Sequence, residues 1–184
     1  MTTRHSGGGL TAALGLALLT VACTAPPGPG AGPPQASASA TVPADAAGPF
    51  PVLDVIDGDT VRVARGGDPV TVRLIGVDAP ETVPQDLPVQ CFGPQASDYT
   101  TRLLNERQVK LEYDQAAGRL DRFGRELAYL WLPDGQLVNL LLIDTGHARE
   151  ADYGHPYRHA EALRSAQDNA RAAGRGLWDP QACP

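Results

Sequence analysis

The chain has 184 residues, of which 42% are hydrophobic and 20% charged, so it contains a globular domain and is not disordered throughout. Its net charge is −6 and its pI about 5.1, which excludes a protein that coats nucleic acid through general positive charge. A binding site for a polyanion must therefore be local, built from clustered arginines with or without a metal ion. The sequence also has no glycine-rich loop followed by Lys and Ser or Thr, which excludes a P-loop enzyme.

Residues 1–23 have the pattern of an export signal. Arg4 precedes an apolar run over residues 10–22, which is too short to span a bilayer comfortably. The run ends in L-T-V-A-C, which resembles a bacterial lipobox and predicts lipidation of Cys23 after cleavage, although Thr20 departs from that pattern. The alternative is an ordinary secretory leader in which Cys23 is accidental. Both interpretations predict an exported protein, and the first anchors it to a membrane through lipid on Cys23.

Residues 24–49 are mostly Pro, Ala, Gly and Ser with almost no charge. Such a segment cannot bury enough apolar surface to fold, so we expect a disordered, semi-extended linker. Removing the first 49 residues from 184 leaves 135, over residues 50–184. That length suits one domain with a sizeable core, and we expect a monomer.

Five short strands are predicted in the domain from alternating or apolar runs between turn residues. Their ranges are 50–55, 61–64, 70–77, 109–113 and 125–132. Pro94 opens a helix between the third and fourth strands, since proline is tolerated in a helix's first turn.

Two further helices are predicted after the fifth strand. Residues 137–145 are nearly all apolar, which fits a buried strand or a buried helix, and Gly146 as a stop signal favours a short helix. The last helix is predicted to begin at Pro156 and end near Ala173. The order predicts an α+β fold: a five-stranded OB-fold β-barrel with a helix between strands 3 and 4 and two C-terminal helices.

The domain is organised around residues 70–81, which read V-T-V-R-L-I-G-V-D-A-P-E. Alternation along a strand places Arg73 on the face opposite Val72, and the turn after the strand carries Asp78 and Glu81. A guanidinium and two carboxylates together can bind a cation, accept a proton and hold a phosphate. Each residue also has an explanation without function: Arg73 as an exposed strand arginine, and Asp78 and Glu81 as solvated acids of a turn.

The chain has three cysteines. If Cys23 carries lipid, Cys91 and Cys183 remain, and an oxidising compartment favours a disulfide between them. Two free thiols or a metal site are the alternatives, but two cysteines alone make a poor zinc shell. His155 and His159 are four residues apart, yet a proline lies between them and no H-E-x-x-H glutamate is present, so we do not expect zinc.

Four motifs occur in an order that resembles the staphylococcal nuclease family. They are D-G-D-T at 57–60, Arg73 on the third predicted strand, V-D-A-P-E-T at 77–82 and D-R-F-G-R at 121–125, and the likeness extends to C-F-G-P-Q-A-S at 91–97 and G-R-G-L-W at 174–178. The resemblance covers roughly residues 51–178. It implies a calcium-dependent nuclease that hydrolyses phosphodiester bonds of DNA and RNA and leaves 5′-OH and 3′-phosphate ends.

The resemblance also implies roles for individual residues. The implied catalytic residues are Arg73 and Arg125, which stabilise the transition state, and Glu81, the general base. The implied Ca²⁺ ligands are Asp59, Asp78 and the backbone carbonyl of Ala79. Elementary chemistry agrees, because hard oxygen donors suit Ca²⁺ and two guanidiniums suit the negative charge that grows on an attacked phosphate.

Substrate contacts are implied for Arg122 and Phe123, where the family often has Lys and Tyr. Phe123 keeps a stacking face but lacks the hydroxyl. Tyr153 and Tyr157 precede the last helix, where the family uses tyrosines, but the alignment there leaves loop packing as an equal alternative. A different function also stays open for the whole domain: a non-catalytic nucleic-acid-binding module on the cell surface, or an envelope protein that uses the domain only for contacts.

Overall fold

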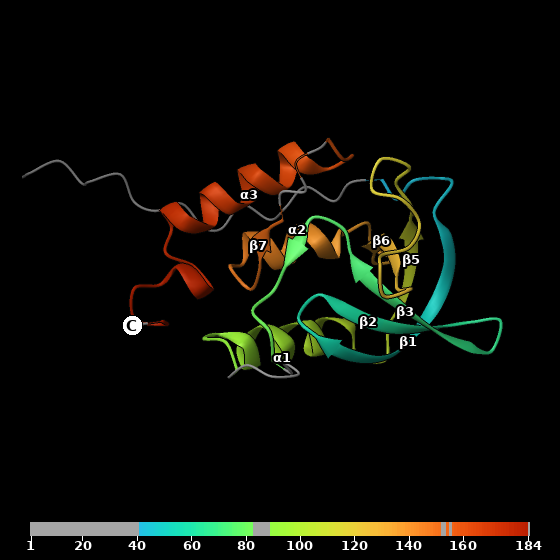
Figure 1. Cartoon of the computed structure of the whole chain (residues 1–184), viewed down its shortest axis with the longest axis horizontal. Coiled ribbons are helices and arrows are strands. Elements are labelled where there is room, and N and C mark those ends of the chain that lie inside the picture. Colours follow the sequence, from blue (N-terminus) through green and yellow to red (C-terminus); the bar gives the residue numbers. More distant parts are fainter. Residues whose placement is uncertain (1–40, 83–88, 152–153, 155, 184) are drawn as a thin grey trace, which may run out of the picture. The chain divides into compact units, whose positions relative to one another are not determined.

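The computed structural model describes residues 41–82, 89–151, 154 and 156–183. Five strands close a barrel in the order β1-β2-β3-β6-β5 (Figure 1). They are β1 (Ala47–Asp57), β2 (Thr60–Arg65), β3 (Asp68–Leu74), β5 (Gln108–Glu112) and β6 (Glu126–Trp131). Strands β3 and β6 pair in parallel, whereas the other barrel neighbours are antiparallel.

The helices follow the predicted order. They are α1 (Gly93–Leu104), α2 (Val138–Asp144), α3 (Ala160–Ala172) and a final 3-10 turn, η1 (Gly176–Trp178). Helix α1 lies between the third and fourth barrel strands in sequence and packs against β1, while α2 packs between β6 and α3 (Figure 1). The predicted α+β fold, a five-stranded OB-fold barrel with its three helices, is confirmed.

The first strand is longer than predicted. It begins at Ala47, not at residue 50, because Ala47 pairs with Leu111 and Phe50 with Val109 of β5. Residues 47–49, predicted as the end of the linker, therefore belong to the barrel. The linker was predicted from side-chain composition, whereas strand pairing uses backbone groups and so does not depend on that composition. Residues 1–40, with the predicted export signal and Cys23, lie outside the described residues.

The predicted strand over 70–77 is broken at Gly76. Strand β3 ends at Leu74, and β4 (Val77–Asp78) pairs with β7 (Arg149–Glu150), a two-residue strand that was not predicted. Gly76 has a φ of +71°, and a Cβ there would lie 2.6 Å from Leu163 Cδ1. The chain can turn here only because this residue is glycine. The turn carries Asp78 out of the barrel sheet.

The last helix begins at Ala160, four residues after the predicted start at Pro156. The reason is a turn in which the Arg158 amide donates to the Asp114 carboxylate at 2.7 Å and the Ala160 amide donates to the Tyr157 carbonyl at 3.2 Å. The buried face of α3 carries Leu163 and three alanines, Ala160, Ala166 and Ala170.

A buried carboxylate fixes the same turn to the barrel. Glu112 on β5 is 1% exposed and accepts bonds from Trp131 Nε1 at 2.6 Å and Arg158 Nη1 at 2.6 Å, with His159 Nε2 at 3.0 Å. Burial alone would raise its pKa, but these partners outweigh burial and lower the pKa of Glu112 to about 2. The turn before α3 is therefore tied to the barrel by a charge that stays ionised.

The C-terminal segment is joined to the segment before α1. Cys91 and Cys183 form the predicted disulfide, which closes a separation of 92 residues. Nearby, the His147 ring stacks on Tyr99 with centroids 4.0 Å apart and lies 5.5 Å from the Phe92 ring. Within the described ranges, no helix combines the length and apolar character needed to cross a membrane.

We predict that His147 weakens the fold in mild acid. Burial, with a smaller effect of the Arg102 charge, lowers the pKa of His147 from 6.5 to about 4. As the pH falls through this window the unfolded chain binds a proton that the folded chain does not, so the free energy of unfolding decreases. Because the His147 residue is only partly buried, the loss should be about 1–2 kcal/mol.

The measurement is urea unfolding of the wild type and His147→Phe at pH 7 and pH 4. The variant keeps an aromatic ring but cannot titrate, so its stability relative to the wild type should rise as the pH falls. A stability difference that is the same at both pH values would contradict the prediction.

Candidate active site

Two acid-bearing turns meet at Gly58. A Cβ on Gly58 would lie 2.6 Å from the Ala79 Cβ and 3.2 Å from the Ala96 Cβ on α1, so the turns can approach this closely only with glycine there. Thr100 of α1 donates its hydroxyl to the Gly58 carbonyl at 2.9 Å. The Ala79 amide donates to Asp59 Oδ2 at 2.7 Å, across 20 residues of sequence. The turn that carries Asp59 is thereby joined to the turn that carries Asp78.

Asp59 is buried and faces an arginine. Its residue is 5% exposed, and its Oδ2 lies 3.0 Å from Arg73 Nη2. Burial raises the pKa of Asp59 to about 7, against the lowering effect of the Arg73 charge and with a further increase from Asp57. Asp78 is more open, with its side chain 61% exposed, and its Oδ1 lies 3.9 Å from the same nitrogen of Arg73. The two acids therefore face a common point beside Arg73.

The oxygen donors at this point fit a hard divalent cation. Among the described residues, no group of three or more His, Cys, Asp or Glu side chains could hold a metal alone. Two carboxylates, Asp59 and Asp78, and the backbone carbonyl of Ala79 are the protein oxygens that the sequence offers here. That set suits Ca²⁺ with water completing its shell and does not suit zinc, which prefers Cys and His.

Backbone carbonyls hold the Arg73 guanidinium in place. Its Nη1 donates to the Val77 carbonyl at 2.6 Å and contacts the Leu74 carbonyl at 3.3 Å, across the bend between β3 and β4. The side chain is 17% exposed. The bend at Gly76 thus supplies the acceptors that orient Arg73 toward Asp59.

Asp121 holds the second arginine. Arg125 Nε donates to Asp121 Oδ2 at 2.6 Å, and Asp121 Oδ1 accepts the backbone amides of Phe123 at 2.8 Å and Arg125 at 2.9 Å. Burial would raise the pKa of Asp121, but these bonds outweigh it and lower that pKa below its ordinary value. Arg125 Nη1 also lies 3.4 Å from the Thr60 hydroxyl, beside Asp59. This role of Asp121 was not predicted, although an Asp two residues before a Phe-Gly turn is typical of a side chain that bonds the backbone of the turn.

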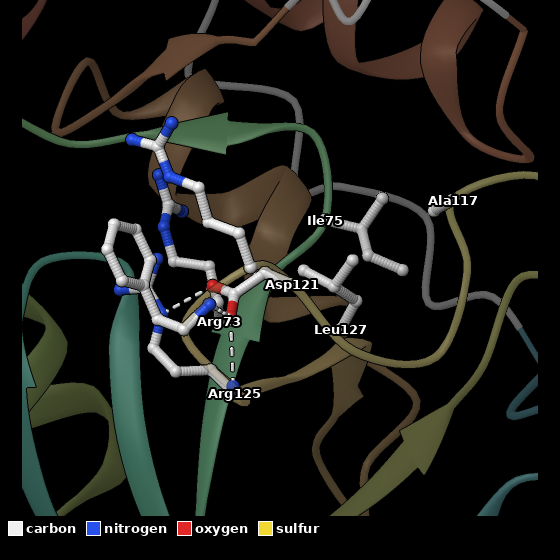
Figure 2. Close-up of a pocket in the computed structure, with 8 residues that line it drawn as sticks. Arg73, Ile75, Ala117, Asp121, Arg125 and Leu127 are labelled. Carbon is white, nitrogen blue, oxygen red and sulfur yellow. Dashed lines mark hydrogen bonds and ion pairs between the residues drawn. The ribbon is translucent and has the colours of Figure 1, made fainter.

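The two arginines border one cavity of about 600 Å³. Its walls are Arg73, Ile75, Ala117, Asp121, Arg122, Phe123, Arg125 and Leu127. Figure 2 shows the charged side chains of Arg73, Asp121 and Arg125 grouped on one side and the apolar side chains of Ile75, Ala117 and Leu127 on the other. The cavity therefore offers positive charge next to an apolar wall.

The exposed aromatic ring at the cavity belongs to Phe123, which is 68% exposed. The guanidinium carbon of Arg122 lies 4.7 Å from its ring centroid and that of Arg125 lies 5.4 Å away. The structure thus places both predicted substrate-contact residues, Arg122 and Phe123, at the same cavity as the predicted catalytic arginines.

Glu81 lies three residues after Asp78 and is partly exposed. It does not border the cavity described above. Its backbone is fixed on both sides by Gln90: the Glu81 amide donates to Gln90 Oε1 at 3.1 Å, and the Gln90 amide donates to the Glu81 carbonyl at 3.0 Å. Gln90 lies in no motif that would have predicted these contacts.

Of the two tyrosines before α3, the structure describes only Tyr157. Tyr157 is 5% exposed, packs on Gly76 and donates its hydroxyl to Glu150, so in this structure it is a packing residue. Tyr153 lies outside the described residues, as does His155. His159 is bonded to Glu112 on β5.

Comparison with known proteins gives a consistent result. A model of the staphylococcal nuclease homologue family matches residues 71–180. A thermonuclease of Staphylococcus hyicus is 42% identical over 129 residues, covering 70% of this chain and 75% of that protein. A thermonuclease of Staphylococcus intermedius is 40% identical over 128 residues, covering 70% and 74%. Endonuclease YncB of Bacillus subtilis is 36% identical over 124 residues, covering 67% and 58%. The chain therefore belongs to the staphylococcal nuclease family.

Proposed function

We propose that this protein is a calcium-dependent nuclease that hydrolyses phosphodiester bonds of DNA and RNA. The observation that carries the proposal is the position of Arg73, which lies beside Asp59 and Asp78 and also borders one cavity with Arg125. The relatives named above as thermonuclease and endonuclease support the same activity.

In the proposed mechanism, Asp59, Asp78 and the Ala79 carbonyl would hold a Ca²⁺ ion, which would supply Lewis-acid chemistry for the reaction. Glu81 accepts the proton of the attacking water as general base. Arg73 and Arg125 donate N–H groups to the phosphate oxygens as their negative charge increases, and each should stabilise the transition state by about 2–4 kcal/mol. The water oxygen bonds to phosphorus as the P–O5′ bond breaks, and the departing 5′ oxygen takes a proton from solvent, so we expect the products to carry 5′-OH and 3′-phosphate ends.

Arg122 and Phe123 are proposed to hold the nucleotide beside the reacting phosphate. An exposed aromatic ring can stack on any base, and a neighbouring guanidinium can pair with a phosphate. A stacked base must first leave its duplex, so we expect single-stranded or locally opened nucleic acid to be preferred.

Calcium removal and Glu81→Gln are each predicted to abolish most of the cleavage. The amide cannot accept the proton from water, so kcat should fall by about 10²–10⁴-fold. The measurement is digestion of single-stranded DNA with Ca²⁺ or with a chelator, and Glu161→Gln on the exposed face of α3 is the matched control. Cleavage that survives both chelation and Glu81→Gln would overturn the mechanism.

Replacing an arginine of the cavity by lysine is predicted to impair the chemical step. Arg125→Lys keeps the charge but loses the planar fork that Asp121 orients, so kcat should fall by about 10²-fold while KM changes little. Arg62→Lys is the control, since Arg62 is exposed and pairs with Asp54. Equal kcat values for the two variants would exclude Arg125 from the mechanism.

The second candidate is a nucleic-acid-binding module without catalysis, and the observation that favours it is that Glu81, the implied general base, does not border the cavity shared by the two arginines. Binding of an oligonucleotide without cleavage at any Ca²⁺ concentration would decide for this candidate. A protein that uses the domain only for envelope contacts differs from both, since neither Ca²⁺ nor a nucleotide bisphosphate would raise its Tm.

We also propose that the protein is exported and anchored to a membrane by lipid on Cys23, and that it acts as a monomer. The apolar run and L-T-V-A-C support this proposal. Cys23→Ser should move the protein from the membrane fraction to the medium or to uncleaved precursor, measured by fractionation and immunoblotting. A wild-type protein already free in the medium would favour the ordinary leader.

A further inference from the structure

The segment before α1 holds the backbone of Glu81 through one residue, Gln90, which uses its side chain and its backbone amide. The Oε1 of Gln90 accepts the Glu81 backbone amide at 3.1 Å, and the Gln90 backbone amide donates to the Glu81 carbonyl at 3.0 Å. Both backbone groups of Glu81 are thus bonded to one residue nine positions away. The Gly93 amide in turn donates to the Gln90 carbonyl at 3.0 Å. The position of the Glu81 backbone therefore depends on where Gln90 is held.

Close packing leaves little freedom to this contact. A Cβ on Gly93 would lie 2.7 Å from the Glu81 carbonyl oxygen, so the start of α1 touches Glu81 directly. Between Gln90 and Gly93, Phe92 adopts a φ of +69°, in the left-handed region. A phenylalanine in that region costs about 1–3 kcal/mol and persists only where its surroundings impose it.

The Cys91–Cys183 disulfide is the covalent part of those surroundings. It joins the residue after Gln90 to the C-terminal segment. Within that segment, residues 175–177 are held in place, because the Leu177 amide donates to the Gly146 carbonyl at 2.9 Å and the Arg175 carbonyl lies where a Cβ on Gly146 would be. The disulfide therefore attaches the residue after Gln90 to the exposed end of the C-terminal segment, which follows the packed residues 175–177.

We propose that Gln90 is a positioning residue for Glu81, and that the Cys91–Cys183 disulfide holds Gln90 in the place where it does this. The consequence for catalysis rests on the proposed function. A misplaced general base slows the chemical step without weakening substrate binding, since a displacement of about 1 Å can lower the rate about 10²-fold. The signature is thus a fall in kcat with an unchanged KM.

The first test compares Gln90→Leu with Gln90→Glu in the full-length chain. Leucine removes the acceptor for the Glu81 amide, whereas glutamate keeps an Oε acceptor. We expect Gln90→Leu to lower kcat about tenfold with KM within twofold, and Gln90→Glu to restore most of the rate. Gln95→Leu, the same change at an exposed position of α1, is the control and should keep the wild-type kcat. Wild-type kcat in Gln90→Leu would overturn the proposal.

The second test needs no activity. Hydrogen exchange of the Glu81 amide, measured by NMR without Ca²⁺, should accelerate about tenfold in Gln90→Leu and in Cys91→Ser/Cys183→Ser, and not in Gln90→Glu or Gln95→Leu. Gln90→Leu retains the disulfide. An unchanged exchange rate of the Glu81 amide in this variant overturns the proposal that Gln90 positions Glu81, even where the double serine variant does not fold. A wild type without nuclease activity overturns the proposed function instead, and the exchange result still decides whether Gln90 holds Glu81.

Discussion

The contact between two turns at Asp59 is the constraint on which the candidate site depends. The carboxylate of Asp59 accepts the Ala79 amide at 2.7 Å and lies 3.0 Å from Arg73 Nη2, so one buried group joins the β1–β2 turn, the turn after β4 and the end of β3. An acid this deeply buried is costly unless it is paired, and here its partners are a cation and an amide. Loss of the Asp59 carboxylate would leave Arg73 without its main acid partner and separate Asp78 from the turn that orients it.

The parallel pairing of β3 with β6 brings the second arginine to the same place. Arg73 is opposite Leu127 in that pairing and Val72 is opposite Glu126, so Arg125 enters β6 beside the strand that carries Arg73. A parallel neighbour requires a long crossover, and α1 and β5 provide it. Two guanidiniums more than 50 residues apart in sequence thus reach one cavity because of the order of the barrel strands. Motif spacing by itself does not determine this.

The sequence was informative where a residue's role is local or belongs to an ordered motif. It predicted the barrel, α1 with Pro94 in its first turn, and the disulfide, all of which the structure shows. It failed where a long-range non-covalent contact decides the local structure. The break at Gly76 depends on how close Leu163 packs, and the contact of Gln90 with Glu81 depends on where α1 begins. Neither contact leaves a periodicity or a spacing in the sequence, so only the folded chain reveals it.

The net charge of −6 is compatible with a site for a polyanion because the charges that matter are local. Arg73, Arg122 and Arg125 border the cavity with a single aspartate, Asp121, whose charge is already engaged by Arg125. Several acids elsewhere are likewise paired inside the domain, as Glu112 is with Arg158. At physiological ionic strength, exposed charges more than about 8 Å apart are largely screened, so a phosphate in the cavity is attracted by the arginines around it far more than it is repelled by the distant surface. Affinity then depends on the geometry that Asp59 and Asp121 impose on two guanidiniums, and the overall pI contributes little.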